Sequence, residues 1–578
     1  MDLRDLGPLL RALGPVALSA IRRGQLWRPA CILTPPHPDI LAEYDVRVPV
    51  SDGFSITINV FRSRSAADRE EPLPVVMCAH PYDNRLLPEL NRTPLNGPPQ
   101  QYRLLPQDGR PTFSTQTSWE SPDPNFWVPS GYAVVNMNLP GYGSSEGPPS
   151  VFSESQAKAF YDAIEWVAAQ PWCDGNIGLN GVSFLAISQY HVAFTKAYGG
   201  PPPSLRCISP WEGVADVYRD LFRPGGVWET GFPIFWWHTE VTAAMNQPVS
   251  AFIEQEGSAA PDWRQDHPVA DEWVESKVPA LEKIEVPTLL CAAFSDQGVH
   301  TPGGFKAFLR LGSKDKWLYT HRWLKWDSYY SPEVQALTKE FFDCFVKGHR
   351  DNGFLDRPRV RLEVRESRDE VSEVLHVNSW PPAKTEYHRW YLDPSSMSLQ
   401  PSAPDDAQEA SYAARTGRLV FRRTFDQDTR IVGHMALHLH FEVRGAEDAT
   451  LAVAIDKKDA QGGSVRFFGT VGAKNDVVTR GFIAAAMRQT ADNSIEWLPQ
   501  LTFRERQPLG VGEVVELAIE VYPHATLFRA GESLELIIAG HEIAKTRPLI
   551  KDLSANRGTH VVHAGSSRPS YLLVPVLP

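Results

Sequence analysis

The sequence contains few cysteines, and they do not form motif pairs. Its 578 residues include six cysteines, scattered along the chain with no C-x-x-C pair. Most stand in apolar contexts, such as Val76-Met77-Cys78 and Leu290-Cys291-Ala292. This pattern is typical of buried free thiols in a reducing compartment. We therefore predict a cytoplasmic protein without a disulfide framework.

The first residues lack the features of a secretory leader. Residues 1–27 have the leucine spacing of an amphipathic helix, but a basic start and a small-residue cleavage site are missing, and Pro15 interrupts the pattern. Neither a signal peptide nor a membrane span is expected here. We expect residues 1–43 to form a docked N-terminal arm, with a membrane-surface anchor as the alternative.

An excess of positive charge is also missing. The formal net charge is −12, which argues against nucleic acid or an anionic membrane as the main partner. With 42% hydrophobic and 22% charged residues, the composition is that of a globular protein with large cores. The length exceeds that of one ordinary domain. A glycine cluster at 141–147 does not fit a dinucleotide loop, so we expect no cofactor and no metal.

The most informative stretch is Gly175–Tyr190. An apolar run at Ile177–Leu179 predicts a buried strand, and 185–194 predicts a helix. The turn between them carries Ser183, which is the layout of a nucleophile elbow, a sharp strand-to-helix turn that exposes a hydroxyl. An ordinary strand–turn–helix corner is the alternative, because Leu185 stands where the second glycine of G-x-S-x-G is expected.

Strands and helices alternate on both sides of this turn. The segments 72–79, 131–138, 286–294 and 316–320 predict buried strands, and 160–168, 303–311 and 331–347 predict helices. Such alternation indicates a mostly parallel sheet covered on both faces. The segment 46–61 predicts a hairpin of exposed-edge strands, and 84–125 predicts a long loop without regular structure.

Two regions depart from this α/β pattern. Residues 211–285 contain aromatic helical stretches and predict an inserted cap. From residue 357 onward, short alternating runs predict a β-sandwich or jelly roll. His434, His438 and His440 include a same-face strand pair that could bind a metal, but a solvated strand face is the favoured interpretation.

Three predicted strands end in a side chain of catalytic type, namely Ser183, Asp296 and His321. Catalytic groups of open α/β sheets gather at the carboxyl ends of the strands. The chain order Ser, Asp, His is that of α/β-hydrolases. We therefore predict a triad in which His321 activates Ser183 and Asp296 orients His321. Asp315 and Asp327 are weaker candidates for the acid. A helix N-cap and a packed strand-end histidine are the structural alternatives for Asp296 and His321.

A tetrahedral intermediate also needs hydrogen-bond donors for its oxyanion. The backbone N–H of Phe184, directly after the nucleophile, is one candidate. The second is expected from the loop after Ala79, where Tyr82 follows Pro81. By position alone, a structural role for Tyr82 is the simpler interpretation.

A family resemblance adds to these patterns. The segment Gly181–Tyr190 resembles the elbow of the cocaine esterase-like, X-Pro dipeptidyl-peptidase-like serine hydrolases, whose usual form is G-x-S-Y-x-G. Further similar motifs run from Tyr44 to the end of the chain: Ser51-Asp-Gly53, His80-Pro-Tyr82-Asp83, Gly131–Val135, Gly141–Gly147, Ile164–Gly175 and Leu572–Pro578. The tryptophan that commonly precedes the family's acid is absent before Asp296, and the Gly-Pro-Trp that precedes its histidine is absent before His321.

The resemblance implies an α/β-hydrolase core with an inserted helical cap and a C-terminal β jelly-roll domain. It divides the chain into an arm (1–43), a core in two parts (44–210 and 286–350), a cap (211–285) and a β domain (357–578). It also implies that the Tyr82 hydroxyl donates to the oxyanion, and that Asp296 and His321 occupy the acid and histidine positions.

We thus expect a serine hydrolase that cleaves an ester or amide of a small-molecule acyl substrate. Trp211, Trp228, Trp236 and Trp237 are candidates for the pocket wall, with a core role as the alternative for each. A proline-specific dipeptidyl aminopeptidase and an acyltransferase would use the same triad, and a binding module without catalysis is the non-enzyme alternative. Homo-oligomerisation stays open.

Overall fold

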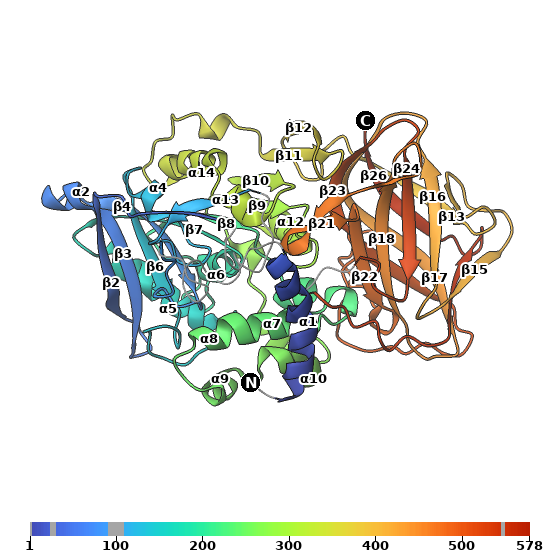
Figure 1. Cartoon of the computed structure of the whole chain (residues 1–578), viewed down its shortest axis with the longest axis horizontal. Coiled ribbons are helices and arrows are strands. Elements are labelled where there is room, and N and C mark those ends of the chain that lie inside the picture. The colour runs from blue at the N-terminus through green and yellow to red at the C-terminus, as the bar shows by residue number, and fades with distance from the viewer. Residues whose placement is uncertain (1–2, 23–30, 91–108, 545–548) are drawn as a thin grey trace.

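A mostly parallel sheet occupies the left half of the molecule in Figure 1. It is seen in a computed structural model that describes residues 3–22, 31–90, 109–544 and 549–578. From β6 to β11, neighbouring strands run parallel. The strands in spatial order are β2 (Ile40–Pro49), β3 (Ser55–Ser63), β6 (Ala133–Asn138), β4 (Leu73–His80), β7 (Cys173–Val182), β8 (Leu205–Trp211), β9 (Thr288–Ala293), β10 (Lys316–His321), β11 (Val360–Arg365) and β12 (Val371–Val377).

Helices cover both faces of this sheet because its parallel strands are buried on both sides. In Figure 1, α14 lies above the sheet, and α5 and α6 lie below it. The covering helices are α2 (Arg64–Asp68), α4 (Pro124–Trp127), α5 (Glu154–Ala168), α6 (Phe184–Ala193), α12 (Thr301–Arg310), α13 (Lys325–Tyr329) and α14 (Pro332–Phe345). The predicted α/β elements thus agree with the structure to within a few residues at most of their ends.

Two predictions for the N-terminal part need correction. β2 is an edge strand, but β3 is not, because its Thr57–Phe61 segment pairs with β6 on the other side. The predicted loop at 84–125 contains β5 (Thr112–Ser114), which pairs in parallel with β1 (Ile32–Thr34), and it also contains α4. Residues 91–108 of that predicted loop lie outside the described residues.

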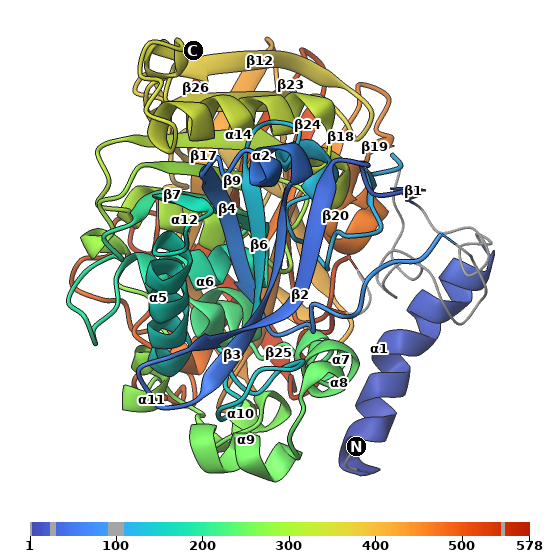
Figure 2. The ribbon, with the colours of Figure 1, turned by 90° about the vertical axis from the view of Figure 1, so that its left-hand side faces the viewer.

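Short helices lie between β8 and β9, in the segment for which the sequence predicts a cap. Its main helices are α7 (Phe232–Trp236), α8 (Thr242–Ala244), α9 (Val249–Glu256), α10 (Trp263–Asp266) and α11 (Glu272–Ser276). The N-terminal helix α1 (Leu3–Arg22) packs against α7 and stands at the outside of the molecule in Figure 2. The rest of the predicted arm includes residues 1–2 and 23–30, which lie outside the described residues. None of the described helices is long and apolar enough to cross a bilayer.

The C-terminal part is a β domain of mainly antiparallel strands in two groups, which are paired with each other at two places. One contains β15 (Gln408–Ala413), β25 (Thr559–Ala564), β17 (Thr429–Arg444), β26 (Tyr571–Leu577), β13 (Glu386–Asp393) and β23 (Val515–Phe528). The other contains β14 (Ser398–Gln400), β16 (Arg418–Thr424), β24 (Ser533–Ala539), β18 (Thr450–Lys458), β19 (Ser464–Val465) and β22 (Thr479–Ala484). A short hairpin, β20 (Phe467–Gly469) and β21 (Ala473–Asp476), turns toward the α/β core. The jelly-roll connectivity stays a prediction.

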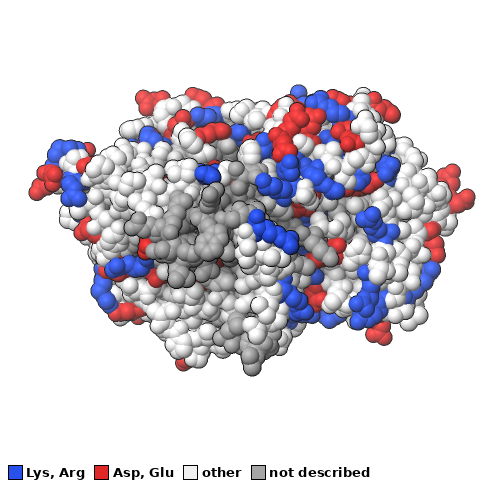
Figure 3. All heavy atoms as spheres, in the orientation of Figure 1, with Lys and Arg blue, Asp and Glu red and all other residues white. Residues whose placement is uncertain are grey.

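Burial and surface charge follow the composition. All six cysteines are buried and free, which confirms the prediction of unpaired thiols. Figure 3 shows basic and acidic side chains interspersed on the face in view, without a broad field of one sign.

A buried ion pair joins the cap to the β domain. The Glu229 carboxylate accepts hydrogen bonds from the backbone N–H groups of Gly231, Phe232 and Ile550. Its other oxygen lies 2.9 Å from Lys551 Nζ, and the two side chains are only 0% and 6% exposed. Breaking a buried pair leaves one charge without a partner, which costs far more than losing an exposed pair.

We expect Glu229→Gln to lower the free energy of unfolding by about 3 kcal/mol, because the buried Lys551 ammonium loses its counter-ion. The measurement is chemical denaturation followed by circular dichroism. Glu71→Gln is the control, because the Arg69–Glu71 pair is 62% and 53% exposed, and its loss should cost less than about 1 kcal/mol. Equal effects of the two changes would contradict this account.

Candidate active site

Ser183 stands in a strained turn between β7 and α6. Its φ is 61° and its ψ is −116°, a backbone conformation that costs energy for any residue with a side chain. Gly181 has φ 154°, and a Cβ at that position would come within 2.6 Å of Leu185. The turn therefore has the backbone of a nucleophile elbow, and it needs glycine two residues before the serine.

A chain of hydrogen bonds leads away from the serine. Ser183 Oγ lies 3.0 Å from His300 Nε2, and His300 Nδ1 lies 2.5 Å from Asp296 Oδ2. The Asp296 carbonyl oxygen accepts from the N–H groups of Val299, His300 and Thr301, so the backbone turns sharply just before α12. This turn brings His300 back onto the carboxylate four residues earlier.

His321 is not part of this chain. It ends β10, is 1% exposed, and its Nε2 lies 3.0 Å from Glu212 Oε1. Its ring stacks on Trp211 at 5.8 Å between centroids. The assignment of His321 as the partner of Ser183 is therefore corrected: a buried carboxylate at the end of β8 binds its imidazole, and the turn after β9 supplies His300 instead.

The weaker acid candidates also lie elsewhere. Asp315 pairs with Arg359 at 3.4 Å, and Asp327 accepts from the N–H of Gly109 at 3.0 Å. Sequence reasoning missed His300, although the i, i+4 spacing from Asp296 within a turn was a usable signal. It also missed Glu212, which follows a strand end in the same way as Ser183.

The charges around Ser183, His300 and Asp296 compensate one another. Burial opposes ionisation of Asp296, but the charge of His300 and its hydrogen bond outweigh it and lower the pKa of Asp296. Burial would likewise lower the pKa of Lys325, but the carboxylates of Glu120, Asp296 and Glu212 outweigh it and raise that pKa. Lys325 Nζ lies 3.1 Å from Glu120 Oε1. The site thus keeps ionised groups in a region that is largely closed to water.

The β domain contributes to the same region. Gly469, at the end of β20, lines the pocket beside Ser183. The hydroxyl of Thr470 accepts a hydrogen bond of 2.6 Å from the N–H of Gly298, within the turn that carries Asp296 and His300.

The pocket that contains Ser183 has an aromatic wall and a few polar groups. Phe152 stacks against Phe184 at 4.7 Å and against Trp236 at 5.7 Å between centroids. The other aromatic lining residues are Trp119, Phe222, Phe232, Phe235 and Trp326, and the polar ones include Tyr82, Glu120, Glu240, Asp296, His300 and Lys325. The cap and the sheet therefore enclose a mainly apolar space over the serine.

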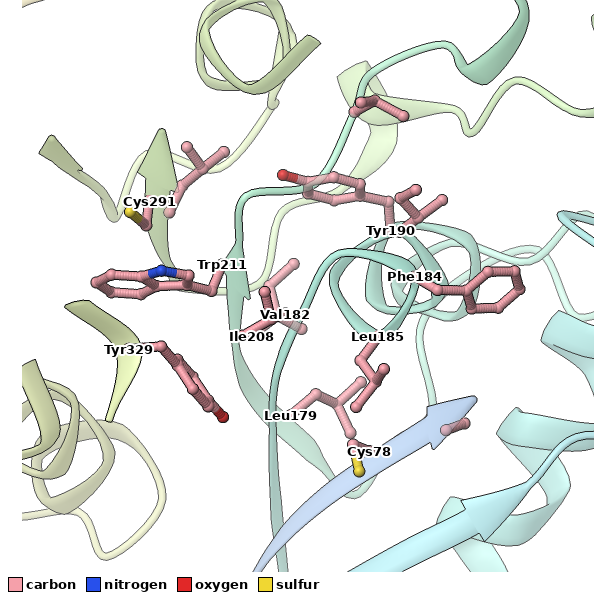
Figure 4. Close-up of a cluster of buried hydrophobic side chains, with 14 of the residues drawn as sticks. Cys78, Leu179, Val182, Phe184, Leu185, Tyr190, Ile208, Trp211, Cys291 and Tyr329 are labelled. Atoms are coloured by element: carbon pink, nitrogen blue, oxygen red, sulfur yellow. The ribbon is translucent and has the colours of Figure 1, made fainter. Parts of the chain in front are cut away.

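Of the four tryptophans proposed for the wall, Trp236 lines this pocket. Trp211 is fully buried behind it, among Ile208, Cys291 and Tyr329 (Figure 4). Trp228 packs edge-on against Tyr218, and Trp237 packs edge-on against Phe252. These three positions favour a core role. Trp119 and Trp326, which lie outside the cap, were not predicted, because a loop and the short helix α13 have no period that indicates which way a ring points.

Both predicted oxyanion donors lie at the pocket. The indole N–H of Trp236 donates to the Tyr82 hydroxyl at 3.3 Å, and Tyr82 is 7% exposed. Burial, with the nearby charges of Glu240 and Glu120, raises the pKa of Tyr82 well above its usual value, so the phenol stays neutral. Phe184 begins α6, and N–H groups in the first turn of a helix have no partner within that helix.

Two of the β-domain histidines, His438 and His440, are partly exposed on one strand face, whereas His434 is buried. His434 is fully buried and accepts from the Trp380 indole at 3.1 Å, and His438 contacts the Glu496 carbonyl at 3.0 Å. Within the described part of the chain, neither these two nor His440 belongs to a group of three side chains that could hold a metal.

Comparisons with known proteins show the family of the chain. The model of the X-Pro dipeptidyl-peptidase (S15) family matches residues 52–324, and that of the X-Pro dipeptidyl-peptidase C-terminal non-catalytic domain matches residues 352–573. A crystal structure of a CocE/NonD family hydrolase from Staphylococcus aureus is 32% identical, with a TM-score of 0.85, and covers 93% of this chain and 94% of that one. The chain belongs to the CocE/NonD family of hydrolases. This CocE/NonD family member is therefore a serine hydrolase.

More distant relatives carry different names. Cocaine esterase from a Rhodococcus species is 23% identical in an alignment that covers 92% of this chain and 98% of the esterase. A putative Xaa-Pro dipeptidyl-peptidase from Bacillus cereus is 23% identical and covers 72% of each chain. An α-amino acid ester hydrolase with a TM-score of 0.64 and 15% identity shares the fold. The family resemblance found in the sequence is confirmed, and it spans more than one activity.

The geometry predicts which histidine makes Ser183 reactive. We expect His300→Ala to slow the reaction of Ser183 with a fluorophosphonate by about 10⁴-fold or more, because the base beside the hydroxyl is lost. His321→Gln keeps an N–H donor for Glu212 and should stay within about tenfold of the unchanged protein. The measurement is the second-order labelling rate by mass spectrometry. A large loss in His321→Gln with normal labelling of His300→Ala would reverse the assignment.

Proposed function

We propose that this protein hydrolyses an ester or amide of a small-molecule acyl substrate, with Ser183 as nucleophile, His300 as general base and then acid, and Asp296 as the carboxylate that orients His300. The observation that supports this most directly is the hydrogen-bond chain from Ser183 Oγ through His300 to Asp296 at the floor of an apolar pocket. Family membership supports the reaction class.

The proposed reaction has two halves. Because Asp296 accepts from Nδ1–H, His300 Nε2 is free of hydrogen and takes the Ser183 proton as Oγ attacks the substrate carbonyl carbon. The tetrahedral intermediate then expels the alcohol or amine, which receives that proton from His300. A water molecule, deprotonated by His300, next attacks the acyl-enzyme and releases the carboxylic acid and free Ser183.

We assign the oxyanion hole to the Tyr82 hydroxyl and the Phe184 N–H. The Tyr82 oxygen already accepts from Trp236, so the hydroxyl hydrogen is directed elsewhere. A neutral phenol in a pocket that excludes water donates strongly to a developing negative charge. The N–H of Phe184 adds a donor at the positive end of α6.

The stacked side chains of Phe152, Phe184 and Trp236 favour a bulky apolar acyl or alcohol group. Burying such a group against aromatic rings supplies binding energy in proportion to the apolar area removed from water. The polar lining residues would then fix the orientation of the reacting carbonyl.

A proline-specific aminopeptidase is the second candidate, and one feature favours it. Glu120 and Glu240 both line the pocket, where a substrate with a free amine could bind a carboxylate. Glu120 also pairs with Lys325 and accepts from the Trp326 indole, and Glu240 lies at the end of the cap's aromatic segment. The S15 family model is consistent with such an activity.

Labelling and a substrate panel test both candidates together. We expect a fluorophosphonate to form a single adduct on Ser183, and Ser183→Ala to lose the adduct and turnover, because His300 lies 3.0 Å from the Ser183 hydroxyl and can activate it. The panel contains aryl and alkyl acyl esters alongside aminoacyl-proline arylamides. Turnover of the esters alone supports the esterase, and turnover of the arylamides supports the aminopeptidase. The absence of both adduct and turnover would refute the proposed function.

Tyr82→Phe tests the oxyanion hole. We expect kcat to fall by about 10²-fold with little change in KM, because the lost donor acts mainly on the transition state. Trp236→Phe is the matched control: it keeps an aromatic wall, removes only the support of the Tyr82 hydroxyl, and should have a smaller effect. An unchanged kcat in Tyr82→Phe would exclude the tyrosine from the oxyanion hole.

A further inference from the structure

Glu212 is a buried carboxylate that the proposed reaction does not use. It follows β8 directly, beside the end of β7 that carries Ser183, since Val182 pairs with Trp211. Its φ is 50°, and the residue is 0% exposed. A strained backbone and a buried charge each lower the stability of the fold. Their presence together at Glu212 indicates that this residue is retained for its function.

The contacts of Glu212 join two histidines. Its Oε1 lies 3.0 Å from His321 Nε2. One of its carboxylate oxygens, one oxygen of Asp296 and one ring nitrogen of His300 lie within 4.8 Å of one another. Among the described residues, Oε2 of Glu212 has no hydrogen-bond partner. A second carboxylate thus stands next to the His300–Asp296 pair.

We propose that Glu212 is a positioning residue for the reaction: a second carboxylate, fixed by His321, that stabilises the imidazolium of His300 and partly replaces Asp296 when that residue is removed. This inference rests on the proposed function, in which His300 is the base. In this proposal His321 holds the Glu212 carboxylate in place, whereas the sequence predicts His321 as the base.

The protonation of His321 decides how much charge Glu212 presents. Within the described residues, Nδ1 of the buried His321 has no hydrogen-bond partner. An imidazolium would leave a buried N–H unsatisfied there, so the neutral form, with Nε2–H donating to Glu212, is favoured. Glu212 then keeps its negative charge next to His300.

That charge acts over a short distance in a poorly solvated region. An opposite charge within 4–6 Å favours the charged form of a titrating group, and the effect is larger where water is excluded. His300 becomes positive when it takes the serine proton, so a nearby carboxylate stabilises the transition state. The other titratable or charged groups facing these residues are Glu120, Glu240, Cys291, Lys325 and Tyr82.

The first test is the pH dependence of kcat/KM. Its acidic limb reports protonation of free His300, which must be neutral to act. Removing a negative charge makes the imidazolium of His300 less stable. We therefore expect Glu212→Gln to move the acidic limb to lower pH by about 1 unit and to reduce kcat.

Two variants separate charge from structure. Glu212→Asp restores the carboxylate and should return the limb toward its original position. Glu442→Gln is the matched control, because Glu442 also pairs with a histidine, His563, at 2.9 Å, but in the β domain. An acidic limb that stays in place in Glu212→Gln, or that moves equally in Glu442→Gln, would overturn the inference.

The second test removes the principal acid. Loss of the aspartate of a serine triad costs about 10⁴-fold in kcat, whereas we expect Asp296→Ala to lose only about 10²-fold because Glu212 remains. Asp296→Ala with Glu212→Gln should lose about 10⁴-fold. A loss of about 10⁴-fold in Asp296→Ala alone, or strictly additive effects, would overturn the role of Glu212.

These outcomes remain distinct from failure of the proposed function. If Ser183 is not labelled and no substrate is turned over, the proposed function fails, whatever Glu212 does. If Ser183 is labelled and active but neither test gives the expected change, only the inference fails. Thermal unfolding of each variant shows whether it is folded, and if Glu212→Gln is not, the single Asp296→Ala measurement decides.

Discussion

The site depends on the left-handed backbone of Ser183. This conformation costs roughly 1–3 kcal/mol and persists only where surrounding contacts impose it. Here the N–H of Ser183 donates to the Trp211 carbonyl at 3.0 Å, and its carbonyl accepts from Ala186 and Ile187 in α6. The same turn directs Ser183 Oγ toward His300, and the N–H of Phe184 follows directly in the chain. Strand pairing and helix formation therefore stabilise a conformation that the serine would not adopt alone.

Much of the fold could be predicted because it follows from local patterns. Buried strands and amphipathic helices have periods that a sequence displays, and the strand-end rule led directly to Ser183 and Asp296. The prediction of His321 as the base was wrong because two histidines, His300 and His321, lie at or after the ends of strands of the sheet and either could serve as the base. His321 has the expected place in the chain, but a contact with Glu212, distant in sequence, determines where its imidazole points. The missing Gly-Pro-Trp before His321 was the available sign of this change.

The pocket wall was predicted less well, for a related reason. An aromatic residue in a helical cap has the same pattern whether it faces a ligand or the core, so Trp211, Trp228 and Trp237 could not be distinguished from Trp236. Trp119 and Trp326 come from a loop and a short helix in which no periodicity indicates orientation. Only contacts between residues distant in sequence, such as the hydrogen bond from the Trp326 indole to Glu120, determine which rings face the pocket.

The hydrogen bond from the Gly298 N–H to the Thr470 hydroxyl connects the turn that contains Asp296 and His300 to the β domain. The family model of that domain describes it as non-catalytic. In evolutionary terms, the β domain cannot drift freely under selection for stability alone, because a shift of its hairpin displaces Asp296 and His300. The two domains are thus expected to be inherited as a pair, and exchanging β domains between relatives would change turnover as well as solubility. Diversity of substrates in such proteins is then more easily reached through the cap, which carries much of the pocket wall but none of the three residues proposed for the triad.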